Sequence, residues 1–183
     1  MKKIIVLCGL ILSCGGEMTK EECPGDWYYE DVAGLTICSD GKVDPDEIRY
    51  AVQVIEQQTA IRYPEVNNLA ELLKEKKVSV YFIDEALAVN CEPVENGVYR
   101  CDKDIGGANV DGHRIYVRYN SCLAFTSLGH EILHSIEKYY LNIPDDVDHT
   151  VPWLFEIGNP GHQTETVEYK IFLDLYFNVA SCQ

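Results

Sequence analysis

Apolar and polar positions follow two rhythms along the chain, and each rhythm predicts a kind of element. After Asp44-Pro45, an N-cap aspartate and a first-turn proline, apolar residues recur at helical spacing. Asn68 and Glu71 form a capping-box-like pair before a second helix. One helix is expected from Pro45 to a stop at Tyr63-Pro64, and others over 68–76, 122–141, a short piece at 151–155, and 164–179. The expected strands cover 34–38, 78–83 and 113–119, with a hairpin between 91 and 101.

These elements predict an α+β fold in which a small mixed sheet packs on one long helix, with further helices around it. The chain has 183 residues, which is enough for one domain with a hydrophobic core. Its formal net charge of −15 would repel a phosphate backbone, so we expect no nucleic-acid partner. We expect the domain to be a monomer.

The first residues, MKKIIVLCGLILSCGGE, predict an export signal. Lys2 and Lys3 precede the apolar run Ile4–Leu12, which is too short to span a bilayer as a helix. The stretch Ile11–Cys14 resembles a bacterial lipobox, which predicts lipid on Cys14 after removal of residues 1–13. An ordinary secretory signal is the alternative, and both interpretations export the protein.

Cleavage before Cys14 would leave a tether of residues 14–25 and a domain of residues 26–183. Gly15 lacks the acidic character associated with retention in the inner membrane. We therefore expect a lipid-anchored protein of the outer membrane or cell surface, with the periplasmic face as an alternative.

The cysteines favour an oxidising compartment. Of eight, Cys8 leaves with the signal and Cys14 takes the lipid, so an even number remains for up to three disulfides. The remaining cysteines are Cys23, Cys38, Cys91, Cys101, Cys122 and Cys182. A three-residue loop, 95–97, with Gly97 in the left-handed region would place Cys91 opposite Cys101. A two-residue Asn-Gly turn would leave that pair out of register.

The stretch LGHEILHSIEKYY carries the main candidate chemistry. His130 and His134 are four apart, so on a helix they lie one turn from each other and can hold one zinc ion. Glu131 lies about 100° round the helix, beside the ligand face, where it can act as general base. The alternative is a core helix with two unrelated histidines.

A catalytic zinc site of this type needs a third protein ligand. No glycine and third histidine follow closely after His134, so the metzincin pattern is absent. The remaining candidates are acids or a histidine farther along the chain: Glu156, Glu165, Glu168, Asp145, Asp146, Asp148 and His149. The glutamates lack the Asn-Glu-x-x-x-Asp context of thermolysin-like enzymes, and the aspartates lack Gly-Thr-x-x-Asp.

The combination of GHEILH with DHTVPWLF resembles small zincin-like proteins, among them exported bacterial lipoproteins, and the layout of SprT-like zinc metallopeptidases. The resemblance covers roughly residues 113–156. It implies a zincin-like fold with zinc held by His130, His134 and His149, and with Glu131 as the base. Asp148 or Asp146 would accept the second N–H of the His149 ring.

The resulting expectation is an exported zinc metalloendopeptidase that acts on a peptide or protein lying along the strand 113–119. The alternative is a non-catalytic zinc-binding or surface-interaction lipoprotein, with Asp148 or Glu156 as a fourth ligand to a structural zinc. His162, in a Gly/Pro loop, is a lesser candidate for stabilising an oxyanion.

Overall fold

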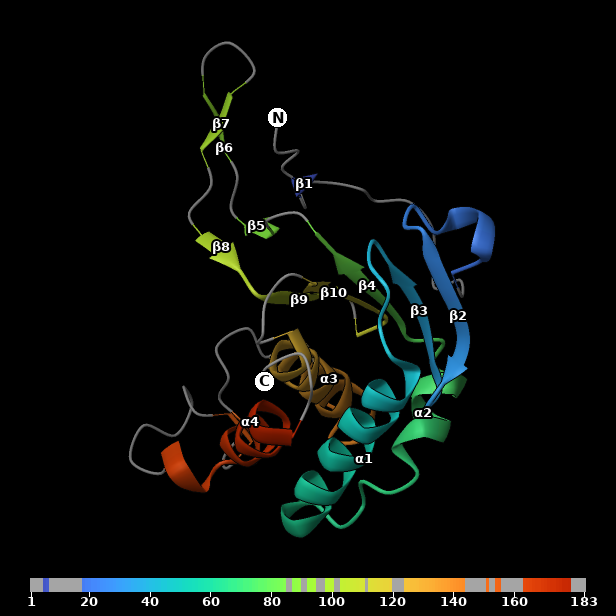
Figure 1. Cartoon of the computed structure of the whole chain (residues 1–183). Helices are drawn as coiled ribbons and strands as arrows, with labels where there is room; N and C mark the ends of the chain where they lie inside the picture. The colour runs from blue at the N-terminus through green and yellow to red at the C-terminus, as the bar shows by residue number, and fades with distance from the viewer. Residues whose placement is uncertain are drawn as a thin grey trace.

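A computed structural model gives the fold of the chain (Figure 1). The structure describes most of the domain and a short piece near the N-terminus. The described residues are 5–6, 18–84, 87–89, 92–94, 98–100, 103–110, 112–119, 124–143, 151, 154–155 and 163–178.

A five-stranded mixed sheet forms one layer of the domain, in the order β2-β3-β4-β10-β9. These strands are β2 (Trp27–Val32), β3 (Leu35–Ser39), β4 (Ser79–Ile83), β10 (Arg114–Arg118) and β9 (Gly107–Val110). β4 lies parallel to both β3 and β10, whereas β2 and β9 run antiparallel to their neighbours. The three strands predicted at 34–38, 78–83 and 113–119 are confirmed; β2 and β9 were not predicted.

The position of β10 corrects one expectation. This strand pairs with β4 on one side and with β9 on the other, so its backbone hydrogen-bonding groups are already paired on both sides. A peptide therefore cannot pair with residues 113–119 as an added strand. Among the described strands, β9 is the edge strand next to β10, and it lies against α3 (Ala124–Tyr139).

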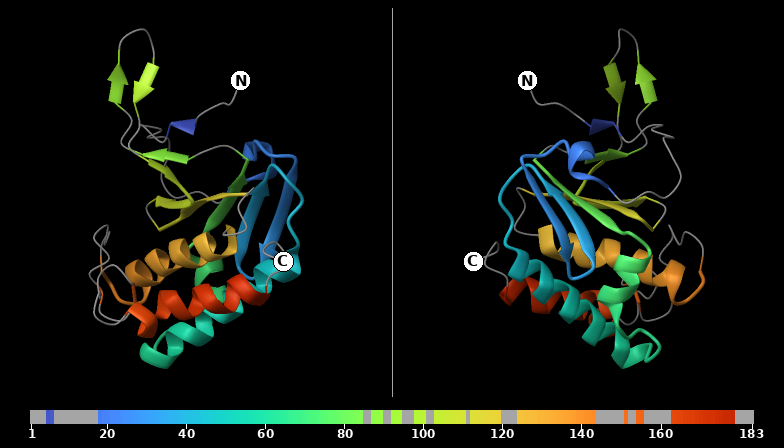
Figure 2. Two further views of the ribbon diagram at one scale, coloured as in Figure 1. Left: turned by 60° about the vertical axis from the view of Figure 1, so that its left-hand side comes forward. Right: turned by 90° about the vertical axis from the view of Figure 1, so that its right-hand side faces the viewer.

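The main helices form the second layer. α1 (Pro45–Arg62), α3 and α4 (Val167–Asn178) lie on the same side of the sheet in all views (Figures 1 and 2). α2 (Leu69–Glu75) links α1 to β4, and the 3-10 turns η1 (Lys20–Glu22) and η3 (Gln163–Glu165) are short. The α+β class is therefore confirmed for the described chain.

Two helix starts show how local and distant residues share the capping. At α1, the Asp44 carboxylate accepts from the Asp46 N–H at 2.9 Å, as predicted. At α2, the expected capping box is wrong: Asn68 has φ 55° and its side chain caps nothing. The Glu56 carboxylate of α1 accepts from the Leu69 N–H instead. A distant acid thus replaces the local cap.

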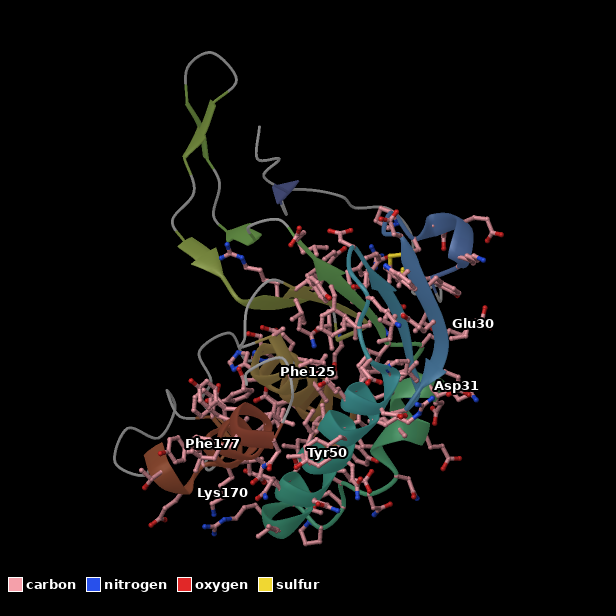
Figure 3. The ribbon with its side chains drawn as sticks, in the orientation of Figure 1. Glu30, Asp31, Tyr50, Phe125, Lys170 and Phe177 are labelled. Carbon is pink, nitrogen blue, oxygen red and sulfur yellow. A yellow bond between two sulfur atoms is a disulfide. The ribbon has the colours of Figure 1, made fainter. Side chains whose placement is uncertain are left out.

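The hydrophobic core lies between the sheet and the helices. α3 contributes a buried apolar stripe, and the ring of Phe125 at its start packs 6.0 Å from the ring of Phe82 on β4 (Figure 3). The other buried residues of that stripe include Leu128, Ile132, Leu133 and Ile136. Burial of this stripe fixes the rotation of α3 about its axis, and the polar residues Glu131, Ser135 and Glu137 of the same helix are buried as well.

A short helix expected at 151–155 is not present in the described residues. Val151, Leu154 and Phe155 form a turn in which the Leu154 N–H donates to the Val151 carbonyl at 3.3 Å. All three side chains are buried. Apolar spacing predicted a helix there, but these three residues are buried as part of the hydrophobic core and not as one face of a helix.

A disulfide joins Cys23 to Cys38 on β3, with a Cα–Cα distance of 5.6 Å (Figure 3). Just before it, Met18 is buried and its carbonyl accepts from the Tyr28 hydroxyl at 3.1 Å. The described part of the expected tether, 18–25, is therefore attached to the sheet. None of the described helices has the length and apolar character needed to cross a membrane.

A β-ribbon projects from the domain between β4 and β9 (Figures 1 and 2). Its strands are β5 (Leu87–Val89), β6 (Glu92–Val94), β7 (Val98–Arg100) and β8 (Lys103–Ile105). β5 pairs with β8, and also with β1 (Ile5–Val6) from the segment expected to be the signal peptide.

The ribbon keeps the register that the sequence predicted. Val89 pairs with Lys103 on the side of positions 91 and 101 away from the loop, and Glu92 pairs with Arg100 on the side of the loop. Cys91 and Cys101 themselves lie outside the described residues, so their disulfide stays a prediction. Cys14, Cys122 and Cys182 also lie outside them.

Candidate metal centre

α3 brings His130, Glu131 and His134 together. One ligand atom from each of these residues lies within 4.8 Å of the others. The two imidazole rings lie one turn apart, with 5.0 Å between their centroids. Such spacing lets two imidazoles and a carboxylate approach one divalent cation.

Both histidine rings are held by carboxylates at the same ring atom. His130 Nδ1 lies 2.5 Å from Glu168 Oε1 at the start of α4. His134 Nδ1 lies 3.0 Å from Glu137 Oε2, three residues later on α3. The side chain of Glu137 is only 1% exposed. An acceptor at Nδ1 places the proton on that nitrogen, so each ring would hold a metal through Nε2.

Histidines that bind metals usually have a carboxylate partner of this kind, because it fixes the ring orientation and raises the basicity of the ring. The sequence placed this role on Asp146 and Asp148, next to His149, and all three residues lie outside the described chain. Glu168 was considered only as a ligand, and Glu137 was not singled out. Its i+3 spacing from His134 on a predicted helix was the signal that could have found it.

The carboxylates also set the electrostatics of the histidines. Burial lowers the pKa of His130, but the Glu168 hydrogen bond and the charges of Glu131 and Glu137 outweigh it and raise the pKa overall. The three glutamates therefore make the neighbourhood of the two rings favourable for positive charge, whether a proton or a metal ion.

Glu131 is 6% exposed and packs against β9. Burial raises the pKa of its carboxyl, while His130, His134 and the Asn109 backbone lower it by a smaller amount. A raised pKa suits a general base, because the carboxylate then takes up a proton more readily near neutral pH.

β9 can approach Glu131 because residue 107 is glycine. A Cβ on Gly107 would lie 2.9 Å from both Cγ and Oε1 of Glu131, which is closer than real Cβ contacts. Gly107 therefore leaves the room that the Glu131 carboxylate occupies, and β9 forms one wall of the site.

Phe155 covers the other side of the histidines. Its ring centroid lies 5.3 Å from that of His130 and 4.8 Å from that of His134. The neighbouring Leu154 carbonyl accepts from the Glu168 N–H at 3.0 Å, so this turn connects the site to α4. His149 lies outside the described residues, only two positions before the buried Val151. Its role as third ligand stays a prediction.

The other candidates do not come together in the described chain. Glu165 is exposed on η3, and His113 lies near the start of β10. His113 Nδ1 contacts the Lys76 carbonyl at 2.8 Å, and Tyr139 lies against the ring, so this histidine links α2, β10 and α3. The remaining candidates Asp145, Glu156 and His162 lie outside the described residues.

Comparison with protein-family models, with curated proteins and with solved structures found no match to this chain.

Proposed function

We propose that the chain is an exported, zincin-like zinc metallopeptidase that hydrolyses peptide bonds. One observation carries the proposal: both histidines of the HExxH pattern turn Nδ1 to a carboxylate, beside a buried glutamate. Histidines that bind a metal usually donate the second ring N–H to such a carboxylate, so the pair of contacts supports a metal at the opposite ring nitrogens. His130 and His134 would hold the zinc, with His149 as the third ligand.

When bound, zinc supplies Lewis acidity, which lowers the pKa of a coordinated water and polarises a substrate carbonyl. Glu131 accepts the proton of the attacking water and passes it to the leaving amine. Its burial against Gly107 keeps the carboxylate poorly solvated and confined, which suits repeated proton transfer.

β9 is the strand along which we propose that the substrate lies. It is the end strand of the described sheet and adjoins Glu131, and extended peptides commonly bind proteins by adding a strand to a sheet edge. This placement replaces the strand 113–119. A peptide or protein is therefore the proposed substrate class.

Export and lipid anchoring at Cys14 belong to the same proposal. The Cys23–Cys38 disulfide supports an oxidising compartment, because disulfides are rare in reducing ones. The outer membrane or the cell surface remains the proposed location, with the lipid as the contact to the membrane.

The test is hydrolysis of a fluorogenic peptide library by the mature chain and by Glu131→Gln. The variant should keep its zinc and lose turnover by about 10²–10⁴-fold, the usual contribution of general acid–base catalysis. Glu30→Gln is the matched control, since Glu30 is exposed on β2, the strand at the opposite end of the sheet (Figure 3). Undiminished hydrolysis by Glu131→Gln would refute the mechanism.

A second candidate, a non-catalytic zinc-binding lipoprotein, is favoured by the covering of the site. Phe155 packs on both imidazoles and Glu131 is almost fully buried, as in a closed structural site. A structural zinc stabilises the fold outright. Chelation should then unfold the domain, whereas a catalytic site should lose activity while the domain stays folded.

A further inference from the structure

The side chain of Asn109, on β9, ties the edge of the sheet to the site helix. Its Nδ2 donates to the backbone carbonyl of Glu131 at 2.6 Å and to Ser135 Oγ at 3.0 Å. Its Oδ1 accepts from the Gly112 N–H at 2.8 Å. Ser135 is fully buried and donates to the Gly112 carbonyl at 3.0 Å. All polar atoms of the Asn109 carboxamide are thus engaged.

The bond to Glu131 is unusual for its place. A carbonyl inside a helix already accepts from the N–H four residues later, so it needs no second donor. Asn109 therefore does not satisfy an orphaned group of α3. Its effect is to fix the distance and rotation between β9 and the turn that carries Glu131.

Asn109 and Gly107 act on Glu131 from the same strand. Residues two apart on a strand point to one face, so both face α3. Asn109 donates to the backbone carbonyl of Glu131. Gly107, which has no side chain, leaves room beside the strand backbone for the Glu131 carboxylate. If β9 moved away from α3, the carboxylate would gain rotamers; if it moved closer, the carboxylate would be displaced.

We propose that Asn109 is a positioning residue, whose carboxamide sets β9 at the spacing that confines the Glu131 carboxylate beside the metal centre. The inference rests on the proposed function, because it needs a metal at His130 and His134. It predicts that replacement of Asn109 lowers the rate of the steps that depend on Glu131 and leaves the metal bound. A misplacement of about 1 Å at such a group can cost about 10²-fold in rate.

The experiment compares Asn109→Ala with Ser135→Ala in the mature chain. Ser135→Ala removes a buried hydrogen bond of the same network but leaves the bond from Asn109 to Glu131, so it controls for packing and stability. Asn109→Ser, too short to reach the Glu131 carbonyl, is a second variant in case alanine prevents folding. Thermal unfolding establishes that each protein is folded at the assay temperature.

Four quantities are measured: the Zn²⁺ affinity by chelator competition, kcat and KM for a cleaved peptide, and the affinity of the Co²⁺-loaded protein for acetohydroxamate from its visible spectrum. Acetohydroxamate chelates a metal and interacts with a neighbouring base, so its binding reports on Glu131 without any hydrolysis. We expect Asn109→Ala to lower kcat by about 10–100-fold and acetohydroxamate affinity by about tenfold. Zn²⁺ affinity and KM should stay within about threefold, since the histidines keep their carboxylates.

Each outcome decides the inference. Unchanged kcat and acetohydroxamate affinity in Asn109→Ala would overturn it, and so would equal losses in Ser135→Ala. A wild type that binds Co²⁺ and acetohydroxamate but cleaves no peptide would remove the peptidase proposal, while the binding arm would still judge Asn109. A wild type that takes up no Co²⁺ would overturn both.

Discussion

Replacement of Glu168 by glutamine tests how the metal centre is supported. Glu168 Oε1 lies 2.5 Å from His130 Nδ1, and the two side chains are 22% and 25% exposed. Glutamine has nearly the same shape and keeps an oxygen that can accept the Nδ1–H. The variant therefore removes the negative charge while it preserves the orientation of the ring.

The size of the effect follows from that geometry. Loss of a carboxylate that supports a metal-binding histidine typically weakens metal affinity by about 10–100-fold. Because glutamine keeps a hydrogen bond and the pair is partly screened by solvent, we expect the lower part of that range. A loss of about 10–30-fold corresponds to roughly 1.4–2 kcal/mol of binding free energy.

The assay is competition for Zn²⁺ with a chromophoric chelator at fixed pH and ionic strength. Glu165→Gln is the matched control: it removes the same charge from an exposed site three residues earlier, and its affinity should stay within about threefold. An unchanged affinity in Glu168→Gln would refute the supporting role. A complete loss of zinc would instead make Glu168 a ligand.

Three further predictions concern stability. Gly129→Ala would place a methyl group 2.7 Å from Ile171 Cγ2 on α4, and the overpacking should exceed the gain in helix propensity, so urea unfolding should show a net loss of about 1 kcal/mol; a stabilised variant would contradict this. Joint replacement of Cys23 and Cys38 by alanine should cost about 3 kcal/mol, from a sequence separation of 15, measured the same way, and an unchanged midpoint would refute it. Burial raises the pKa of Glu131 in the metal-free protein, so its stability contribution is present below the ordinary carboxyl pKa of 4.5 and is lost as pH rises through the folded pKa. In chelator, Glu131→Gln should therefore melt above wild type at about pH 7 and level with it at about pH 4, and the reverse order would contradict the sign.

Features that depend on neighbours along the chain could be predicted from the sequence. The Asp44 cap and the His130–His134 pair belong to this group, because each needs only the geometry of one helix turn. The register of the ribbon could also be predicted, since a three-residue loop at 95–97 sets which residues of the two strands face each other.

Features that depend on packing between distant segments could not be predicted from the sequence. Glu168 is 38 residues from His130, and nothing in the sequence distinguished it as a partner of Nδ1 rather than a ligand. The same holds for Glu56 of α1, which accepts from the Leu69 N–H at the start of α2. β9 has the sequence GANV, too short and too small to give an alternating signal, although it carries both Gly107 and Asn109.

The most direct test of the account is the zinc content of the mature chain after exhaustive dialysis, measured by elemental analysis beside His134→Ala and His149→Ala. The account predicts one tightly held zinc per wild-type chain, and loss or strong weakening of zinc in both variants. Zinc retained by His149→Ala would move the third ligand to another residue. A wild type without zinc would contradict the central claim and leave α3 as a core helix.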